Sequence, residues 1–434
     1  MTGCRKCHQQ HRRGNPRRGP PIHKVGEDLL LEIFLCLPSL ATLICATLTC
    51  RAWRHAVASS PSFRRRFREI HPAPLLGLFF HAPGPVQTPN TPGFPTFIPA
   101  RRRDRDLTVA IRGGDFFLTF LDDLPDQGSC WDIVDCCCGC VLLMNWDDSS
   151  FAVFNPLTRR SEDVFDLGSE DIFDDNRGTR AMVNPRLLFS DEDPNSFCVV
   201  LLAHDERRVR ATVFSSDSRE WLVLPWVDVP ASSSDANCSI QCDGGMQANR
   251  FLYWVYRDQR YLLSLDTATM EFYITKLPRC LRRLRYSSFD VGETKDGATC
   301  IVYSDRVSTG VLMHTRDDDG VEKWVRDRVV PLDKELERAL RIGLDHGTVL
   351  NHLVDNPDLF VFAIRDDYAY LSASGVDQDS QNPCWFMSLS LETMKLERLF
   401  RRTLGDPVHP YIMAWPSSLV GNYGRFALED APDP

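Results

Sequence analysis

The chain has 434 residues, of which 43% are hydrophobic and 25% are charged, and its formal net charge is −9. This composition is that of a globular protein and excludes wholesale disorder, while the acidic balance argues against a protein built mainly to bind nucleic acid. The length fits about three domains, or one small domain joined to a large β fold.

The first 24 residues differ from the rest in charge. They contain seven Lys and Arg and no acid, so they carry +7, which leaves −16 for residues 25–434. Because they are also nearly free of apolar residues, they cannot bury enough surface to fold, and we predict a disordered basic tail. A nuclear-import or polyanion-binding patch is the alternative for such a run of Lys and Arg.

Two features concern the cellular compartment. No stretch approaches the ~20 apolar residues that cross a bilayer, and residues 1–24 lack the apolar centre of a secretory signal. Three consecutive cysteines, Cys136, Cys137 and Cys138, are more typical of reduced thiols than of a disulfide framework. We therefore expect an intracellular protein of the nucleus or cytoplasm, without a membrane partner.

Residues 25–70 have the apolar spacing of short helices. The first helix carries one apolar stripe, and Pro38 ends it. Ser39 is the predicted N-cap of a second helix, and Ser60-Pro61 is the predicted start of a fourth. The apolar positions of the first three helices include Leu29, Leu30, Ile33, Phe34, Leu37, Leu40, Leu43 and Trp53. So small a helical domain has little core of its own, so we expect its apolar stripe to pack against something else.

The remainder is predicted to be mostly β structure. Residues 71–105 are rich in proline and are interpreted as a linker, residues 106–425 as the β domain, and residues 426–434 as a tail. Hairpins begin at residues 151, 211, 261, 311 and 385, and an apolar strand precedes each. A loose repeat of three or four strands is typical of propeller blades, whereas a β-sandwich, the alternative, shows turns without a long period. The number of blades stays open, with a sixth hairpin within 107–121 or 405–425 as one possibility.

Motifs that carry chemistry are absent from the sequence. It contains no Gly-rich phosphate loop, His-Glu-x-x-His or Gly-x-Ser-x-Gly. If residues 136–140 form one strand, Cys136 and Cys138 share one face and Cys137 the other, so these thiols cannot all reach one zinc ion. We interpret them as buried free cysteines, with zinc or redox chemistry as the alternative. We predict no catalytic residue, no metal site and no cofactor.

Taken in order, the residues of the helical region resemble an F-box. The matching features are Glu27-Asp28 before Leu29, then Leu37-Pro38, Cys50-x-x-Trp53-Arg54 and Pro61-x-Phe63. Two positions depart from the common pattern: Val25-Gly26 stands where Leu-Pro is usual, and Cys36 where Arg is usual. The segment Val153–Thr158, within residues 106–425, resembles the F-box-associated β-propeller region of plant proteins, especially those of grasses. The resemblance implies an α+β multidomain chain, with a small all-α F-box followed by a mostly all-β propeller-like domain.

The resemblance also implies a function. An F-box docks on the Skp-family adaptor of a cullin–RING ubiquitin ligase, and the C-terminal domain holds the protein that is to be ubiquitinated. The implied adaptor-binding residues are Val25, Leu29, Leu30, Ile33, Phe34, Leu37, Pro38, Leu40, Leu43 and Trp53, of which Trp53 is expected to pack internally. The chain would then be a non-catalytic receptor subunit.

Three other interpretations remain open at this point. The apolar stripe could fold against the chain's own β domain. The β domain could be a propeller-fold enzyme with a site in its central channel. The protein could instead be a scaffold that needs no adaptor and whose basic tail binds nucleic acid or a membrane surface.

Overall fold

The computed structural model describes most of the chain between residues 26 and 420. The described ranges are 26–80, 95–100, 105–123, 131–167, 170–189, 196–205, 207–229, 245–256, 260–283, 289–305, 308–316, 322–332, 334–336, 338, 358–365, 367–374, 383–403, 407–416 and 419–420. The predicted tails at 1–24 and 426–434, and Val25, lie outside them. The chain divides into two compact units, one of residues 1–71 and 418–434 and one of residues 72–417.

The described part of the first unit is helical, as predicted. Its helices are α1 (Glu27–Leu35), α2 (Leu40–Thr47), α3 (Arg51–Ser59) and α4 (Pro61–Ile70). Ser39 accepts a hydrogen bond from the Thr42 backbone N–H at 3.2 Å, and Ser60 accepts one from Phe63 at 3.3 Å. Both predicted N-caps are therefore confirmed. No helix in the described residues is long and apolar enough to cross a membrane.

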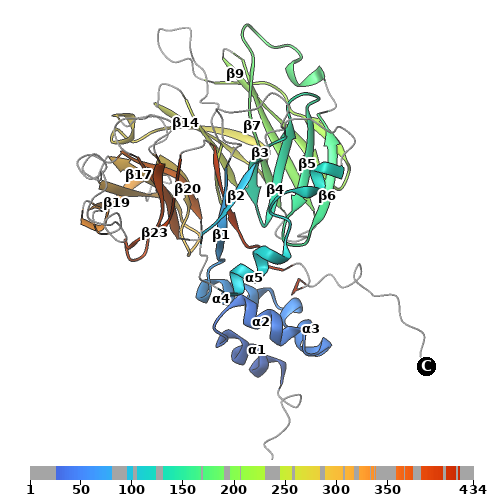
Figure 1. The fold of residues 1–434 in the computed structure, drawn as a ribbon. Coiled ribbons are helices and arrows are strands. Elements are labelled where there is room, and N and C mark those ends of the chain that lie inside the picture. Colours follow the sequence, from blue (N-terminus) through green and yellow to red (C-terminus); the bar gives the residue numbers. More distant parts are fainter. Residues whose placement is uncertain are drawn as a thin grey trace, which may run out of the picture. The chain divides into compact units, whose positions relative to one another are not determined.

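The second unit is a six-bladed β-propeller, so the sandwich alternative is wrong. Its strands form six antiparallel sheets, which are visible in Figure 1. The closing sheet contains β1 (Leu75–Phe80), β2 (Thr96–Pro99) and β24 (Val408–Ile412). The next two contain β3 (Trp131–Cys137), β4 (Cys140–Asn145), β5 (Ser150–Asn155) and β6 (Arg160–Asp166), then β7 (Ala181–Phe189), β8 (Phe197–His204), β9 (Arg208–Ser215), β10 (Glu220–Val223) and β11 (Val227–Asp228). The last three contain β12 (Met246–Ala248), β13 (Phe251–Val255), β14 (Tyr261–Asp266) and β15 (Glu271–Lys276); β16 (Phe289–Glu293), β17 (Thr299–Asp305), β18 (Ser308–Arg316) and β19 (Glu322–Pro331); and β20 (Asp358–Arg365), β21 (Tyr368–Ser374), β22 (Pro383–Ser390) and β23 (Leu396–Thr403).

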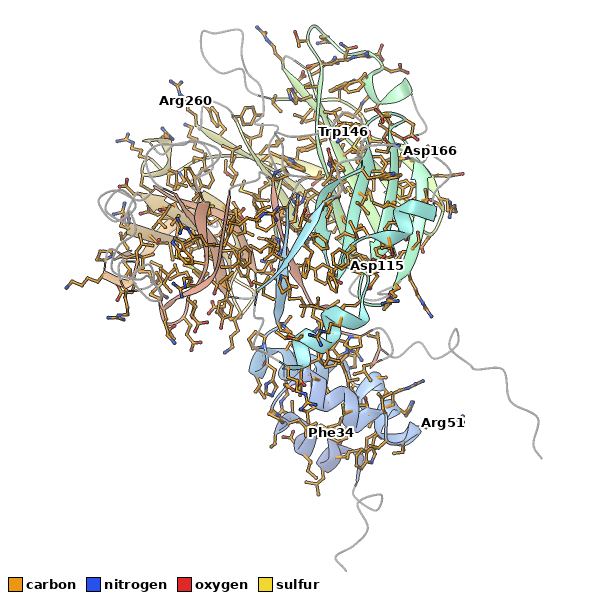
Figure 2. All side chains as sticks on the ribbon, viewed as in Figure 1. Phe34, Arg51, Asp115, Trp146, Asp166 and Arg260 are labelled. Atoms are coloured by element: carbon orange, nitrogen blue, oxygen red, sulfur yellow. The ribbon has the colours of Figure 1, made fainter. Side chains whose placement is uncertain are left out.

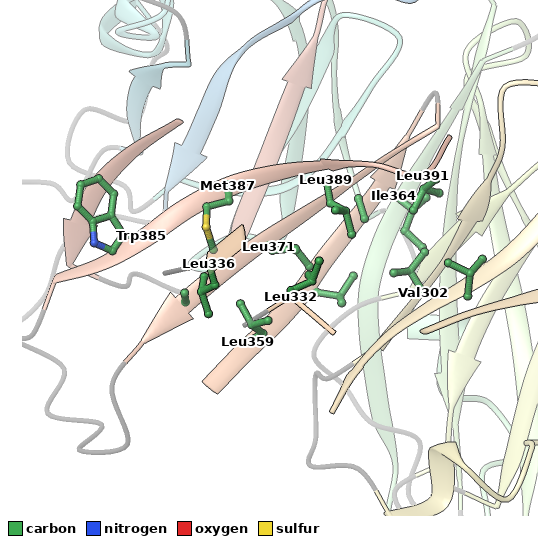
Figure 3. Close-up of a cluster of buried hydrophobic side chains, with 14 of the residues drawn as sticks. Val302, Leu332, Leu336, Leu359, Ile364, Leu371, Trp385, Met387, Leu389 and Leu391 are labelled. Atoms are coloured by element: carbon green, nitrogen blue, oxygen red, sulfur yellow. The ribbon is translucent and has the colours of Figure 1, made fainter. Parts of the chain in front are cut away.

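Apolar side chains between neighbouring blades form the core. Leu142 on β4 packs with Val199 on β8, and similar clusters join each blade to the next around the ring. Figure 3 shows the cluster between the β16–β19 and β20–β23 blades, which includes Val302 and Leu371. Because successive strand residues face opposite sides, each middle strand supplies apolar residues to two such clusters, which explains why these strands are almost uniformly apolar.

The closing blade corrects two predictions. The segment interpreted as a linker (71–105) contributes β1 and β2, and β1 pairs with β24 from the other end of the domain. The sixth blade is therefore not a single hairpin within 107–121 or 405–425. Its strand β24 lies in the second of these ranges, but β1 and β2 come from the other end of the domain. Residues 105–123 instead contain a helix, α5 (Arg105–Gly113), and a 3₁₀ turn, η2 (Thr119–Asp123). Proline in β2 is tolerated because β2 is an edge strand.

Several outer hairpins share one turn. Its last residue has a positive φ, as at Arg159, Arg219, Met270 and Met394, and no glycine is used there. The first residue of the turn stabilises it through its side chain. Asn155 accepts from the Thr158 backbone N–H, and Asp266 accepts from that of Ala268. The five predicted hairpins are all present, and four of them share this turn, at 155–159, 215–219, 266–270 and 390–394.

Two aspartates connect innermost strands of adjacent blades. Asp135 on β3 accepts a hydrogen bond from the Leu187 backbone N–H on β7 at 2.8 Å, and its other oxygen lies 3.2 Å from Arg186 Nη1. Asp290 on β16 likewise accepts from the backbone N–H of Ile364 on β20. Both aspartates are buried. Their carboxylates therefore satisfy backbone donors where the innermost strands of two blades meet.

We predict that Asp135→Ala lowers the free energy of unfolding by about 3–5 kcal/mol, because it leaves the Arg186 guanidinium buried without its partner. Urea denaturation measures this difference. Asp147→Ala is the control, since Asp147 lies exposed in the β4–β5 turn, and we expect it to change stability by less than about 0.5 kcal/mol. Equal effects of the two substitutions would contradict the role given to Asp135.

Candidate functional site

Helix α1 presents apolar side chains to solvent. Leu29 and Ile33, one helical turn apart, are 58% and 41% exposed. Pro38 is exposed just beyond the helix, and Leu37 is half-buried. Two large apolar residues at i and i+4 on a helix form a continuous strip. We call Leu29, Ile33 and Pro38 the α1 surface.

The other predicted residues of this stripe lie inside the helical unit. Leu30, Phe34, Leu40 and Leu43 are buried. The Phe34 ring meets the Trp53 ring edge to face, with centroids 5.4 Å apart, and Figure 2 marks Phe34 among the helices. The predicted stripe therefore divides into an inner edge, which holds the helices together, and an outer edge, which is free to contact another molecule.

An ion pair fixes α1 against α4. Arg66 on α4 binds both carboxylate oxygens of Glu32 on α1, at 2.5 and 3.2 Å. This hydrogen bonding lowers the pKa of Glu32. Because both side chains are about half exposed, the pair adds little stability, but its two-point geometry orients α1 and with it the α1 surface.

Further exposed apolar residues were not assigned to a surface from the sequence. Leu48, which follows α2, is 70% exposed, and Ile70 at the end of α4 is 54% exposed. Leu48 continues the apolar pattern of α2, so spacing alone places it in the core. In the structure α2 ends at Thr47, so Leu48 lies beyond the helix and its side chain is in solvent.

Charged side chains gather at the centre of the propeller. Asp135, Arg186 and Asp290 are buried, and Arg365 is half-buried and donates to the Gln247 carbonyl oxygen at 3.2 Å. Burial raises the pKa of Asp290 to about 6, although Arg365 opposes the shift. Both carboxylates already accept backbone N–H groups. The described geometry therefore assigns these acids to joining blades.

The cysteine cluster differs from the prediction. Cys138 and Gly139 form the two-residue turn between β3 and β4, both with positive φ, so residues 136–140 are not one strand. Cys140 is buried, Cys136 and Cys137 are half-buried, and Cys138 is exposed. Burial raises the pKa of the Cys136 and Cys140 thiols, which makes them poor nucleophiles. The described residues contain no group of three or more His, Cys, Asp or Glu placed to hold a metal ion.

Comparison with known proteins identifies the helical unit. Residues 27–69 match the family model described as F-box-like. No curated protein matches the chain. Among solved structures, a protein from Lactobacillus plantarum is 9% identical, with 76% of this chain and 83% of that chain covered and a TM-score of 0.36. A chain of the nidogen/laminin complex is 12% identical over 78% and 99%, with a TM-score of 0.35, and a luciferin-regenerating enzyme is 10% identical over 64% and 78%, with a TM-score of 0.29. These structural likenesses carry no argument about function.

A first prediction concerns the inner edge of the stripe. Phe34→Ala should destabilise the helical unit by about 3–4 kcal/mol, because it removes a buried ring and its contact with Trp53. Hydrogen–deuterium exchange over residues 27–69 measures the loss of protection. Leu29→Ala is the matched control on the same helix and should leave the exchange unchanged, as expected for an exposed side chain. Comparable deprotection by both variants would refute the division of the stripe.

A second prediction concerns pH. Because the pKa of Asp290 is higher in the folded protein (about 6) than in an unfolded chain (about 3.9), the folded state binds the extra proton. The stability that Asp290 contributes is therefore full below pH ~4 and is lost as pH rises through ~6.

Asp290→Asn abolishes this titration while keeping an oxygen acceptor. The melting temperature of the wild type minus that of Asp290→Asn should therefore decrease between pH 4 and pH 7. A difference that stays constant or increases over this range would show that Asp290 is not the group described.

Proposed function

We propose that the protein is the substrate-recognition subunit of a Skp–cullin–F-box ubiquitin ligase. The observation that carries the proposal is the F-box-like match at residues 27–69 together with the exposed α1 surface on that same unit. A small helical unit that leaves Leu29 and Ile33 in solvent gains apolar burial when it binds another protein. A Skp-family adaptor is the partner that an F-box generally binds, and through it the protein would join a cullin–RING ligase.

The propeller supplies the second half of the proposed role. A ring of six sheets is a rigid support whose loops can be varied without loss of the core, which suits the recognition of a target protein. In this role the chain performs no chemistry itself, and ubiquitin transfer belongs to a separate enzyme. The proposal includes a location in the nucleus or cytoplasm, and it extends the resemblance to F-box proteins of grasses.

The cysteines fit the reducing compartments named in the proposal. All eleven cysteines within the described ranges are free thiols. Proteins in oxidising compartments commonly carry disulfides, whereas nuclear and cytoplasmic proteins keep their thiols reduced. This observation supports the location without identifying a partner.

The test is binding to a Skp-family adaptor. We expect the full chain to co-elute with the adaptor in size-exclusion chromatography. Leu29→Asp combined with Ile33→Asp should weaken the affinity at least ~100-fold in calorimetry, because each substitution places a charge in a desolvated contact worth about 2 kcal/mol. Leu222→Asp is the matched control, since Leu222 on β10 is 61% exposed, and it should bind as the wild type does.

Two outcomes would contradict the proposal. The wild-type chain could elute without the adaptor, or the Leu29/Ile33 variant could bind as tightly as the wild type. After either result, the α1 surface would have to be interpreted as an internal contact or as the binding site of a different partner.

A further inference from the structure

We propose that Cys137 and Cys138 are an oxidative modification site, at which a small disulfide such as oxidised glutathione converts the two adjacent thiols into a reversible intramolecular disulfide. The two residues lie where β3 enters the turn to β4. The site goes beyond the proposed function, because its chemistry needs neither the adaptor nor a target protein. Three features support it: the contact between the two sulfur atoms, the conformation of the turn and the exposure of one thiol.

The two sulfur atoms are in contact. The Cys137 thiol donates a hydrogen bond to Cys138 Sγ, and the two sulfurs are 3.7 Å apart. A disulfide forms by attack of one sulfur on another, so thiols that already touch need only a small movement to reach the S–S bonding distance of about 2 Å. Cys140 lies opposite Cys137 on β4, but it is buried in the apolar cluster between blades. An oxidant in solvent therefore meets the Cys137–Cys138 pair first.

Cys138 has a backbone conformation that cysteine rarely adopts. Its φ is 48°, and that of Gly139 is 75°. A two-residue turn with positive φ at both positions is of type I′, which favours Asn, Asp or Gly at its first position. Other residues are disfavoured there because the Cβ comes close to the following carbonyl oxygen. Turn geometry therefore does not explain the choice of cysteine, and residues held in such conformations cluster at functional sites.

The two thiols differ in exposure, and this difference sets the order of the reaction. Cys138 is exposed, whereas Cys137 is half-buried. The hydrogen bond to Cys138, together with burial, raises the pKa of the Cys137 thiol well above its ordinary value. Since the thiolate is the nucleophile in disulfide exchange, the exposed Cys138 reacts with the oxidant and Cys137 reacts second.

The reaction then has two steps. The Cys138 thiolate attacks one sulfur of oxidised glutathione, which forms a mixed disulfide and releases one glutathione thiolate. Cys137 loses its proton to solvent, and its sulfur attacks Cys138 Sγ, which forms the Cys137–Cys138 bond and releases the second glutathione thiolate. The two protein sulfurs lose two electrons in total, and the two glutathione sulfurs gain them. Each glutathione thiolate takes up a proton from solvent.

A disulfide between neighbouring residues is readily reduced. Consecutive Cα atoms are about 3.8 Å apart, whereas Cα atoms joined by an ordinary disulfide are ~4.4–6.8 Å apart. The ring that the bond closes is therefore strained, and strained disulfides have the more oxidising potentials of labile, regulatory bonds. Such a bond forms under oxidation and is lost when the thiol pool is reducing, which is the behaviour of redox-sensing disulfides.

The turn packs against the closing blade, so the modification has a route to the rest of the domain. The Tyr411 hydroxyl, which is on β24, donates to the Gly139 carbonyl oxygen at 2.6 Å. A Cβ on Gly139 would lie 2.8 Å from the Cβ of Ala414, so the segment after β24 contacts this turn directly. Closing the disulfide changes the backbone at Cys138, next to the carbonyl group that Tyr411 binds. Oxidation therefore weakens this hydrogen bond to the strand that closes the ring.

The test treats the reduced full-length protein with excess oxidised glutathione. Remaining thiols are blocked with N-ethylmaleimide, the disulfides are then reduced, and the released thiols are labelled with iodoacetamide and mapped by mass spectrometry. We expect Cys137 and Cys138 to acquire the second label together, on a peptide that carries no glutathione before the reduction. Excess reduced glutathione, added before blocking, should reverse the reaction.

Single variants test the order of the two steps. Cys137→Ser removes the second thiol, so we expect glutathione to remain on Cys138 as a mixed disulfide. Cys138→Ser should lower the second label on Cys137 at least tenfold. Cys45→Ser is the matched control, since Cys45 is another exposed cysteine, on α2, and it should leave the yield of the disulfide within twofold of the wild type. Cys140→Ala should do the same.

A second measurement needs no variant and applies if one of them melts at a lower temperature than the wild type. Phenylarsine oxide bridges two neighbouring thiols with loss of one water. We expect it to protect both Cys137 and Cys138 of the wild type from N-ethylmaleimide, and a dithiol, but not a monothiol, to remove the protection. Prior treatment with oxidised glutathione should prevent the arsenical from binding at these residues.

Three results would overturn the modification site: Cys137 bonded to Cys140 instead, glutathione left on Cys138 of the wild type while Cys137 stays reduced, or no protection by the arsenical. Hydrogen–deuterium exchange measures the link to the closing blade. Residues 408–412 should lose protection when the wild type is oxidised and should not when Cys138→Ser is treated in the same way. Equal exchange before and after oxidation of the wild type would contradict the link through Tyr411.

Discussion

The β domain depends on the pairing of its first strand with its last. β1 and β24 are antiparallel, with Gly77 opposite Tyr411 and Phe79 opposite His409, although more than 300 residues separate them. Without such a pair, the strands from the two ends of the domain would not form a common sheet, and the ring of six sheets would stay open. The entropic cost of closing a long loop grows only with the logarithm of its length. The strand pairing and the surrounding aromatic cluster are therefore enough to offset the cost of joining the two ends of the domain. Phe79, Phe116 and Tyr411 lie together there. With the ring closed, each blade packs on both of its neighbours.

The helical unit has the opposite property, since it is too small to bury all its apolar residues. Phe34 and Leu43 are taken up by its own core, whereas Leu29 and Ile33 stay in solvent. An exposed apolar strip is costly in a free protein and favourable in a complex. A chain with one propeller unit and one helical unit that exposes an apolar strip is consistent with the proposed receptor role, in which one unit docks on the ligase and the other holds the target.

The sequence predicted the outer three strands of most blades well and the innermost strands poorly. Middle strands such as β8 and β14 are apolar runs followed by a polar turn, and this pattern is visible without a structure. Several innermost strands are short or carry polar or charged residues, such as Gln247 on β12 and Asp290 on β16, and segments with such residues have the composition of loops. They face the centre of the ring, where their partners come from the next blade. Gly292 on β16 is another example, because a Cβ there would lie 2.3 Å from the Cβ of Ile364. The sequence around Gly292 carries no information about this contact, because Ile364 is distant along the chain.

The sequence by itself determined what depends on residues close together in the chain: the four helices, the caps at Ser39 and Ser60, the five hairpins, and the order of an F-box-like unit before a β domain. The tertiary structure decided what depends on residues far apart. It made the proline-rich segment a strand pair of the closing blade, and it divided one apolar stripe between core and surface. It also brought Arg328 of one blade to the Leu391 carbonyl oxygen of the next. The physical reason is that hydrogen bonding within a turn is fixed by spacing along the chain. Burial and charge pairing depend on which distant segments meet. The spacing of apolar residues within one segment does not show which other segment it will contact.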